Sequence, residues 1–239
     1  MGDRCACQSG KGSIKKSTEA KYDQQWRSSD ETASAERRKS LSLVADPLLS
    51  MVRPFDGKTV VDLGIGTGAL AFRALEVDRP ASMIGLDFSS AGLCVARGIS
   101  RSDKFRDRDL ELLRADLESI PLATRSVDII LSQATVNLLP NKTLAFREMA
   151  RIAKPGSRIA ISDAFRTRKP TGCESWEQCI AGAITVAEFS ALASSVGLMV
   201  MGQVDLTAQV RQLVMGKRWD WPEFLESNMD YRGFLLMRS

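Results

Sequence analysis

Short apolar runs alternate with amphipathic segments through the middle of the chain, and this alternation predicts strands and helices in turn. The apolar runs, several of them rich in β-branched residues, predict strands at 59–63, 82–86, 110–114, 127–132 and 158–162. Between them, apolar positions at helical spacing predict helices at 69–76, 90–100 and 143–152. Because strands and helices alternate at this spacing, we expect an α/β fold with a doubly wound, mostly parallel sheet and helices on both faces.

After residue 163 the alternation becomes less regular. A helix is expected at 186–196, and strands at 198–206 and 234–237 complete a seven-stranded sheet. The stretch 164–185 has no clear period. We interpret it as a lid over the carboxyl edge of the sheet.

Residues 1–40 are polar and contain too few apolar side chains to form a core face. We interpret them as a mobile or partner-folded N-terminal arm, with Tyr22 and Trp26 as its anchors. Residues 41–239 are then the folded domain. Its first helix, at 40–51, presents one apolar face, made by Leu41, Val44, Leu48 and Leu49.

The composition is that of an ordinary globular protein, with 239 residues, 44% hydrophobic and 26% charged. No apolar run approaches the roughly 18 residues of a membrane helix, and the first residues lack the pattern of a secretory signal. We therefore expect a cytoplasmic protein without a membrane partner. The net charge is only +4, and the basic residues are spread along the chain, so no nucleic-acid partner is expected.

The absence of histidine narrows the possible chemistry, because it excludes Ser–His–Asp and Cys–His catalysis and His-ligated zinc. The five cysteines are an odd number without a CxxC pair, which favours reduced thiols over a disulfide framework. They are Cys5, Cys7, Cys94, Cys173 and Cys179. Cys94 is expected in the core, since it lies between Leu93 and Val95 within a predicted helix.

Three successive strand ends carry residues that suit a nucleoside. Gly64, Gly66 and Gly68 follow the first predicted strand, where glycine lets the backbone turn tightly and approach a ligand. Asp87 ends the second strand and can accept hydrogen bonds from both hydroxyls of a ribose, and Asp116 follows the third. Either aspartate can instead be a helix cap or a turn residue. The pattern predicts one adenosine-sized crevice at the carboxyl edge.

The segments VDLGIGTG, GLD, RADLESIPLATRSVDIILS and FREMARIAKPGSRIAISD resemble the class I S-adenosylmethionine-dependent methyltransferases over roughly residues 58–207. The resemblance implies a Rossmann-like sheet and S-adenosylmethionine as the cofactor. It also implies a set of cofactor-binding residues: Asp62, Gly64, Gly66 and Gly68 around the methionine moiety, Asp87 with Phe88 at the ribose, Asp116 with Leu117 near the adenine, and Ser132 with Gln133 towards the methyl group.

Two later segments, VNLLPNK (136–142) and WEQCIAGAIT (176–185), resemble the arsenite methyltransferases. In that family cysteine thiolates hold trivalent arsenic, whose lone pair attacks the methyl group. The resemblance implies Cys179 as a metalloid ligand, with Gln133 and Asn137 as further catalytic residues. Ala134 stands where that family has a second cysteine, so Cys173, Cys5 or Cys7 would have to replace that thiolate.

Three functional hypotheses follow. The first is methylation of thiol-bound trivalent arsenic or a related metalloid, with Cys179 and Cys173 as ligands. The second is methylation of a small organic molecule, the metalloid site having been lost at Ala134. The third is a non-catalytic protein that binds the cofactor or a metalloid. In each case the partner is a small molecule or a metalloid, and the sequence makes no prediction of oligomeric state.

Overall fold

The structure is a computed structural model that describes most of the chain: residues 11–27, 31–167, 182–219, 221, 224–225 and 228–239. The strands are β1 (Thr59–Leu63), β2 (Ser82–Asp87), β3 (Leu110–Arg114), β4 (Val127–Gln133), β5 (Ala153–Arg166), β6 (Leu198–Asp205) and β7 (Met229–Arg238). The α-helices are α1 (Lys11–Arg27), α2 (Glu31–Ser50), α3 (Ala69–Val77), α4 (Ser90–Ser100), α5 (Lys142–Ile152), α6 (Val186–Ser195) and α7 (Thr207–Met215), and η2 (Val136–Leu138) is a 3₁₀ turn. None of these helices is long and apolar enough to span a membrane.

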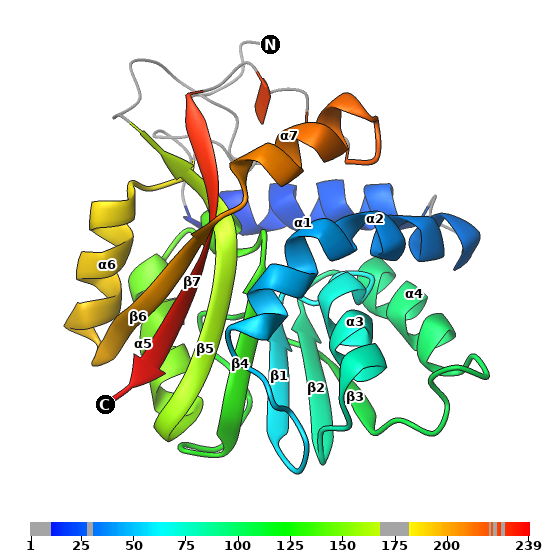
Figure 1. The fold of residues 1–239 in the computed structure, drawn as a ribbon, viewed down its shortest axis with the longest axis horizontal. Helices are drawn as coiled ribbons and strands as arrows, with labels where there is room; N and C mark the ends of the chain where they lie inside the picture. The colour runs from blue at the N-terminus through cyan, green and yellow to red at the C-terminus, as the bar shows by residue number, and fades with distance from the viewer. Residues whose placement is uncertain (1–10, 28–30, 168–181, 220, 222–223, 226–227) are drawn as a thin grey trace.

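The described residues form one seven-stranded sheet in the order β3-β2-β1-β4-β5-β7-β6 (Figure 1). Every pair from β3 to β5 is parallel, and β7 runs antiparallel to both of its neighbours. The expected doubly wound, mostly parallel α/β sheet is confirmed. In such a sheet the carboxyl ends of the parallel strands meet at one edge, where ligands bind.

Side chains of successive strand residues point to opposite faces of the sheet, and each face is covered by its own helices. On one face, Phe146 of α5 and Phe189 of α6 belong to the same buried cluster as Val61 of β1. On the other face, residues of α2, α3 and α4 pack with Val60 and Ile129. The predicted helices on both faces are therefore present.

Several element boundaries differ from those predicted. β1, α4 and β3 begin and end as expected, whereas β5 starts earlier, at Ala153. Helix α5 ends at Ile152, and the Pro155-Gly156 pair lies within β5. The pairing of β4 shifts between Val127, which faces Ala153, and Ile129, which faces Arg158. Such an irregularity accommodates extra residues in one strand.

The polar N-terminal region differs most from its prediction. In place of a mobile or partner-folded arm, residues 11–27 form the helix α1, which crosses the sheet at one end in Figure 1. Trp26 is buried, as expected for an anchor. The helix has one packed stripe at a spacing of four residues, made by Ile14, Thr18, Tyr22 and Trp26. The predicted face of α2, from Leu41 to Leu49, is buried as expected.

Candidate functional site

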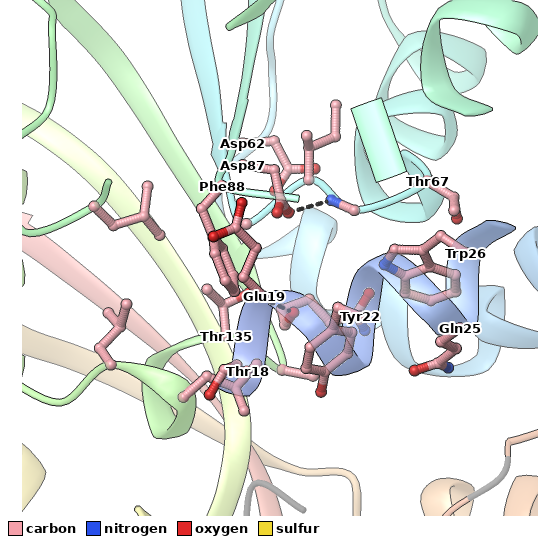
Figure 2. Close-up of a pocket in the computed structure, with 18 of the residues that line it drawn as sticks. Thr18, Glu19, Tyr22, Gln25, Trp26, Asp62, Thr67, Asp87, Phe88 and Thr135 are labelled. Carbon is pink, nitrogen blue, oxygen red and sulfur yellow. Dashed lines mark hydrogen bonds between the residues drawn. The ribbon is translucent and has the colours of Figure 1, made fainter. Parts of the chain in front are cut away.

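A cavity of about 710 Å³ lies at the carboxyl edge of the sheet, and we call it the carboxyl-edge cavity. It is bounded by α1, the turn after β1, the ends of β2 and β3, the segment after β4, and two tryptophans near α7. Figure 2 shows Thr18, Glu19, Tyr22, Gln25 and Trp26 on the α1 side of this space, facing Asp62, Asp87 and Phe88 at the strand ends. Its size is typical of a site for a small molecule or cofactor.

The turn after β1 brings backbone close to the cavity. Gly64 has a φ of +79°, and a Cβ atom there would lie 2.2 Å from the hydroxyl oxygen of Thr135, so only glycine fits. The backbone N–H of Gly64 donates to Leu86 at 2.8 Å, which ties the turn to β2. Gly64 and Gly66 line the cavity. Gly68 does not, and caps the N-terminus of α3 in a left-handed conformation.

Asp87 fixes the same turn from the end of β2. Its Oδ2 accepts the backbone N–H of Gly66 at 2.7 Å, and its Oδ1 accepts that of Ser89 at 2.8 Å. Burial raises the pKa of Asp87 to about 6, although these backbone hydrogen bonds act to lower it. Since each carboxylate oxygen can accept two hydrogen bonds, Asp87 keeps the capacity to bind ligand hydroxyls.

Asp62 is the most unusual carboxyl group of the cavity. It is buried on β1, and its Oδ2 has no hydrogen-bond partner. Burial, with a smaller contribution from the charge of Asp87, raises the pKa of Asp62 to about 7. A hydrogen bond from the backbone of Ala71 acts in the opposite direction and lowers the pKa. An unpartnered buried carboxylate oxygen is costly, so a cationic or N–H-bearing ligand group would stabilise it.

Asp116 and Leu117 line the part of the cavity that follows β3, close to Phe88 after β2. The Oδ1 of Asp116 accepts the backbone N–H of Glu118 at 2.9 Å, and its Oδ2 lies 2.6 Å from the Nζ of Lys15 on α1. The structure thus brings the three predicted strand ends together in one space. The roles of these residues towards a cofactor stay predictions.

Helix α1 closes the cavity opposite the strand ends, and polar contacts hold it there. Lys15 also pairs with Glu118 at 2.7 Å, and Glu19 pairs with Arg114. Asp23 accepts hydrogen bonds from the hydroxyl of Ser89 at 2.7 Å and the backbone of Ala91, and the Ser89 bond in particular lowers the pKa of Asp23.

Sequence reasoning missed the contribution of α1 because the helix is polar overall. The four-residue spacing from Ile14 to Trp26 was the available signal, since residues four apart share a helix face. It is a weak signal, because Thr18 occupies one of the four positions.

Two predicted site residues point into the protein rather than into the cavity. The hydroxyl of Ser132 donates to the carbonyl of Leu63 at 3.0 Å and is fully buried. The side-chain amide of Asn137 donates to Asp163 and to the carbonyl of Ala164, each at 2.8 Å. These bonds position the segment after β4. Gln133 does line the cavity, and its amide nitrogen has no partner.

The cysteines give little support for a metal site within the described part of the chain. Cys173 and Cys179, and likewise Cys5 and Cys7, lie outside the described residues. Cys94 is exposed, contrary to the core position that we expected, because the buried face of α4 is made by residues such as Leu93 and Ile99. Among the described residues, no group of three or more cysteine, aspartate or glutamate side chains is arranged to hold a metal ion.

Comparisons with known proteins are informative once this geometry is known. A family model described as a methyltransferase domain matches residues 54–221. The chain is 32% identical over 148 residues to an arsenite methyltransferase from Halobacterium salinarum, a match that covers 59% of this chain and 37% of that protein. It is 34% identical over 123 residues to a 2-phytyl-1,4-naphtoquinone methyltransferase from Thermosynechococcus vestitus, covering 51% of this chain and 52% of that protein.

A solved structure has a similar fold. Geranyl diphosphate C-methyltransferase from Streptomyces coelicolor A3(2) superposes with a TM-score of 0.69 at 16% identity, covering 83% of this chain and 76% of that one. At this identity the likeness concerns the fold alone. The matches span about half or less of the length of the two curated relatives.

Proposed function

The chain belongs to the methyltransferase domain family whose model spans residues 54–221, and from this premise we propose that it binds S-adenosylmethionine in the carboxyl-edge cavity and transfers the methyl group to a small molecule. The observation that carries the proposal is the meeting of Asp62, Gly66, Asp87 and Asp116 in one cavity at the strand ends. Folds of this kind bind nucleotides at this edge.

The described residues fit this cofactor. Asp62, with its unpartnered oxygen, suits the ammonium group of the methionine moiety. Asp87 has free acceptor capacity for the ribose hydroxyls, and Asp116, Leu117 and Phe88 surround the remaining space, where the adenine would lie.

When bound, the cofactor supplies a sulfonium methyl group, so that the acceptor's lone pair forms the new bond while the electrons of the carbon–sulfur bond neutralise the sulfur. Such a displacement needs alignment and exclusion of water more than it needs a strong base. Helix α1 forms a wall of the cavity, and the Asp87–Gly66 hydrogen bond keeps the turn in place. A histidine-free chain therefore has the groups that this chemistry requires.

Thiol-bound trivalent arsenic is one acceptor class. It is supported by the WEQCIAGAIT segment with Cys179 and by the similarity to an arsenite methyltransferase. Soft thiolates suit a soft, thiophilic centre, and arsenic's lone pair carries no proton to remove. Cys179 and Cys173 are the proposed ligands.

A small organic molecule is the second acceptor class. It is favoured by Ala134, which lines the cavity and has no group that can coordinate arsenic. It is also favoured by the apolar cluster against which Ala134 packs, since this cluster includes Trp219 and Trp221, which line the cavity. The similarity to a naphtoquinone methyltransferase agrees with this class.

The experiment for the proposed function has two steps. Calorimetry should first show one equivalent of S-adenosylhomocysteine bound to the reduced protein; no binding would contradict a methyltransferase role. Radiolabelled methyl transfer to arsenite, in the presence of a thiol, is then compared between wild type, Cys179→Ser and Cys94→Ser. The arsenic hypothesis expects activity that Cys179→Ser abolishes and Cys94→Ser retains. If the protein binds S-adenosylhomocysteine but does not methylate arsenite, arsenite is excluded as the acceptor.

A further inference from the structure

The carboxyl-edge cavity has two ends of different chemistry. Most charged lining residues gather at the strand ends. They are Asp62, Asp87 and the ion pairs Lys15–Asp116 and Arg114–Glu19. The other lining residues include members of a separate apolar cluster that lies beneath α1 and α7. They are Tyr22, Leu41, Ala69, Ala134, Leu138, Trp219 and Trp221.

On the basis of the proposed function, we infer that this apolar end binds the methyl acceptor, and that the acceptor is an uncharged organic molecule with a flat, largely apolar body and one hydrogen-bonding oxygen. The first support is the nature of the wall. Trp219 and Trp221 lie 5.6 Å apart between ring centroids and are tilted by 34°, and both are more than nine-tenths buried. Aromatic walls of this kind bind flat apolar ligands through area burial and ring contacts.

The second support is a pair of polar atoms without partners. The hydroxyl of Thr18 is buried on α1, where the residue is only 2% exposed, and the amide nitrogen of Gln133 is buried at the end of β4. Both residues line the cavity. A buried donor without a partner is destabilising, and a ligand oxygen that accepts a hydrogen bond from either group removes that penalty. A purely hydrocarbon ligand would leave both groups unsatisfied.

The third support is the distribution of charge. The lining carboxylates Asp62, Asp87 and Asp116 lie at the strand ends. Glu19 of α1 pairs with Arg114, Lys15 pairs with Asp116, and Lys21 is exposed. Among the described residues that line the cavity, the aromatic end therefore has no buried cation as a partner for an anionic acceptor. Transfer of a carboxylate into such surroundings is costly, so neutral acceptors are favoured.

The test uses the 239-residue chain saturated with S-adenosylhomocysteine, with 2-naphthol as the neutral probe and 2-naphthoate as its anionic counterpart. Calorimetry should show 2-naphthol binding at least about tenfold more tightly than 2-naphthoate, because only 2-naphthoate must transfer a charged carboxylate out of water. Thr18→Val should weaken 2-naphthol binding by about fivefold through loss of one hydrogen bond. Ser17→Ala, on the same helix but outside the cavity lining, is the matched control and should bind like wild type.

Thr18→Val removes a hydroxyl that has no partner in the free protein, so the variant should fold as stably as wild type. A change in 2-naphthol affinity would therefore reflect the lost contact with the ligand. Trp221→Leu should lower 2-naphthol affinity about tenfold as a second readout. The inference is overturned if 2-naphthol does not bind, if 2-naphthoate binds equally well, or if Thr18→Val and Ser17→Ala behave alike. Loss of S-adenosylhomocysteine binding itself, measured first on the same samples, would instead contradict the proposed function.

Discussion

The two walls of the carboxyl-edge cavity are built by different means. The floor, defined as the turns after β1, β2 and β3, consists of backbone fixed by buried groups such as Asp87. The roof, defined as α1, is held by a buried stripe that includes Ile14 and Trp26, and also by side-chain pairs that solvent reaches, with Lys15 35% and Asp116 46% exposed. Exposed pairs contribute about 0–1 kcal/mol each, whereas buried charge-assisted hydrogen bonds contribute about 1.5–3 kcal/mol.

This difference separates two properties of the site. The floor belongs to the sheet, so its geometry at the proposed cofactor site is fixed by the fold. The ion pairs of the roof can break and reform while the sheet stays folded. We therefore expect substitutions in the floor to change cofactor affinity, and substitutions of the roof's ion pairs to change the rate of cofactor release.

The largest effect is expected from Asp87→Ala in the floor. The change removes the acceptor of two backbone N–H groups and the proposed partner of the ribose hydroxyls. S-adenosylhomocysteine affinity, measured by calorimetry, should fall about 100-fold or more, which corresponds to roughly 2.7 kcal/mol. Asp103→Ala, which removes an exposed carboxylate far out on the surface, is the control and should bind normally. A loss of less than about fivefold would contradict the assignment of Asp87.

The second prediction concerns Asp62, whose burial should make the free protein less stable as pH rises. The pKa of Asp62 is raised to about 7, so the folded state still holds a proton that the unfolded state loses near pH 4. Stability is greatest below the unfolded pKa and declines as pH rises towards 7. Asp62→Asn should flatten this dependence and raise Tm at pH 8 by about 2–4 °C, while weakening S-adenosylhomocysteine binding.

Asp163→Asn provides the contrast for that experiment. Burial also raises the pKa of Asp163 to about 6, but its oxygens accept hydrogen bonds from Asn137 and Ala164. Its substitution should lower Tm, because a donor amide would then face existing donors. If Asp62→Asn and Asp163→Asn shift Tm in the same direction, the unpartnered state of Asp62 is not what distinguishes it.

The floor was predictable from the sequence because its signals are local. The strand Thr59–Leu63, the glycines after it and Asp87 lie within thirty residues and follow known rules of parallel sheets. Local spacing does not indicate where the side chains of Ser132 and Asn137 point. Ser132 lies within β4 and Asn137 after it, and only the fold shows that the hydroxyl of Ser132 donates to Leu63 and the amide of Asn137 donates to Asp163.

The roof and the aromatic end depend on contacts that no local pattern specifies. Thr18 and Trp221 line one cavity from opposite ends of the chain. The polar composition of residues 1–40 concealed a packed stripe, because Ile14, Tyr22 and Trp26 each stand alone between polar neighbours. Tertiary packing, more than helix propensity, stabilises such a helix.

The third prediction tests the roof through Lys15→Met, which breaks the pairs with Asp116 and Glu118. The dissociation rate of S-adenosylhomocysteine, followed by stopped-flow fluorescence, should rise about three- to tenfold, as expected for loss of about 1 kcal/mol. High salt should accelerate release from wild type more than from the variant, because it screens the same pairs. Lys104→Met, which breaks an exposed pair with Glu76 outside the cavity, is the control and should leave the rate unchanged. An unchanged rate in Lys15→Met would show that the pairs of Lys15 do not hold α1 over the cavity.

The smallest effect is expected from Cys94 on α4, the helix against which α1 packs, and Ile99 on the same helix provides the contrast. Cys94 is exposed, so Cys94→Ser should change the free energy of unfolding by less than about 0.5 kcal/mol and remove one thiol that reacts in the native protein. Ile99 is buried against the sheet, so Ile99→Ala should cost about 2–5 kcal/mol. Denaturant unfolding and thiol titration measure both. A loss above about 1 kcal/mol in Cys94→Ser would contradict the exposed position of Cys94 and would mean that a different face of α4 is buried.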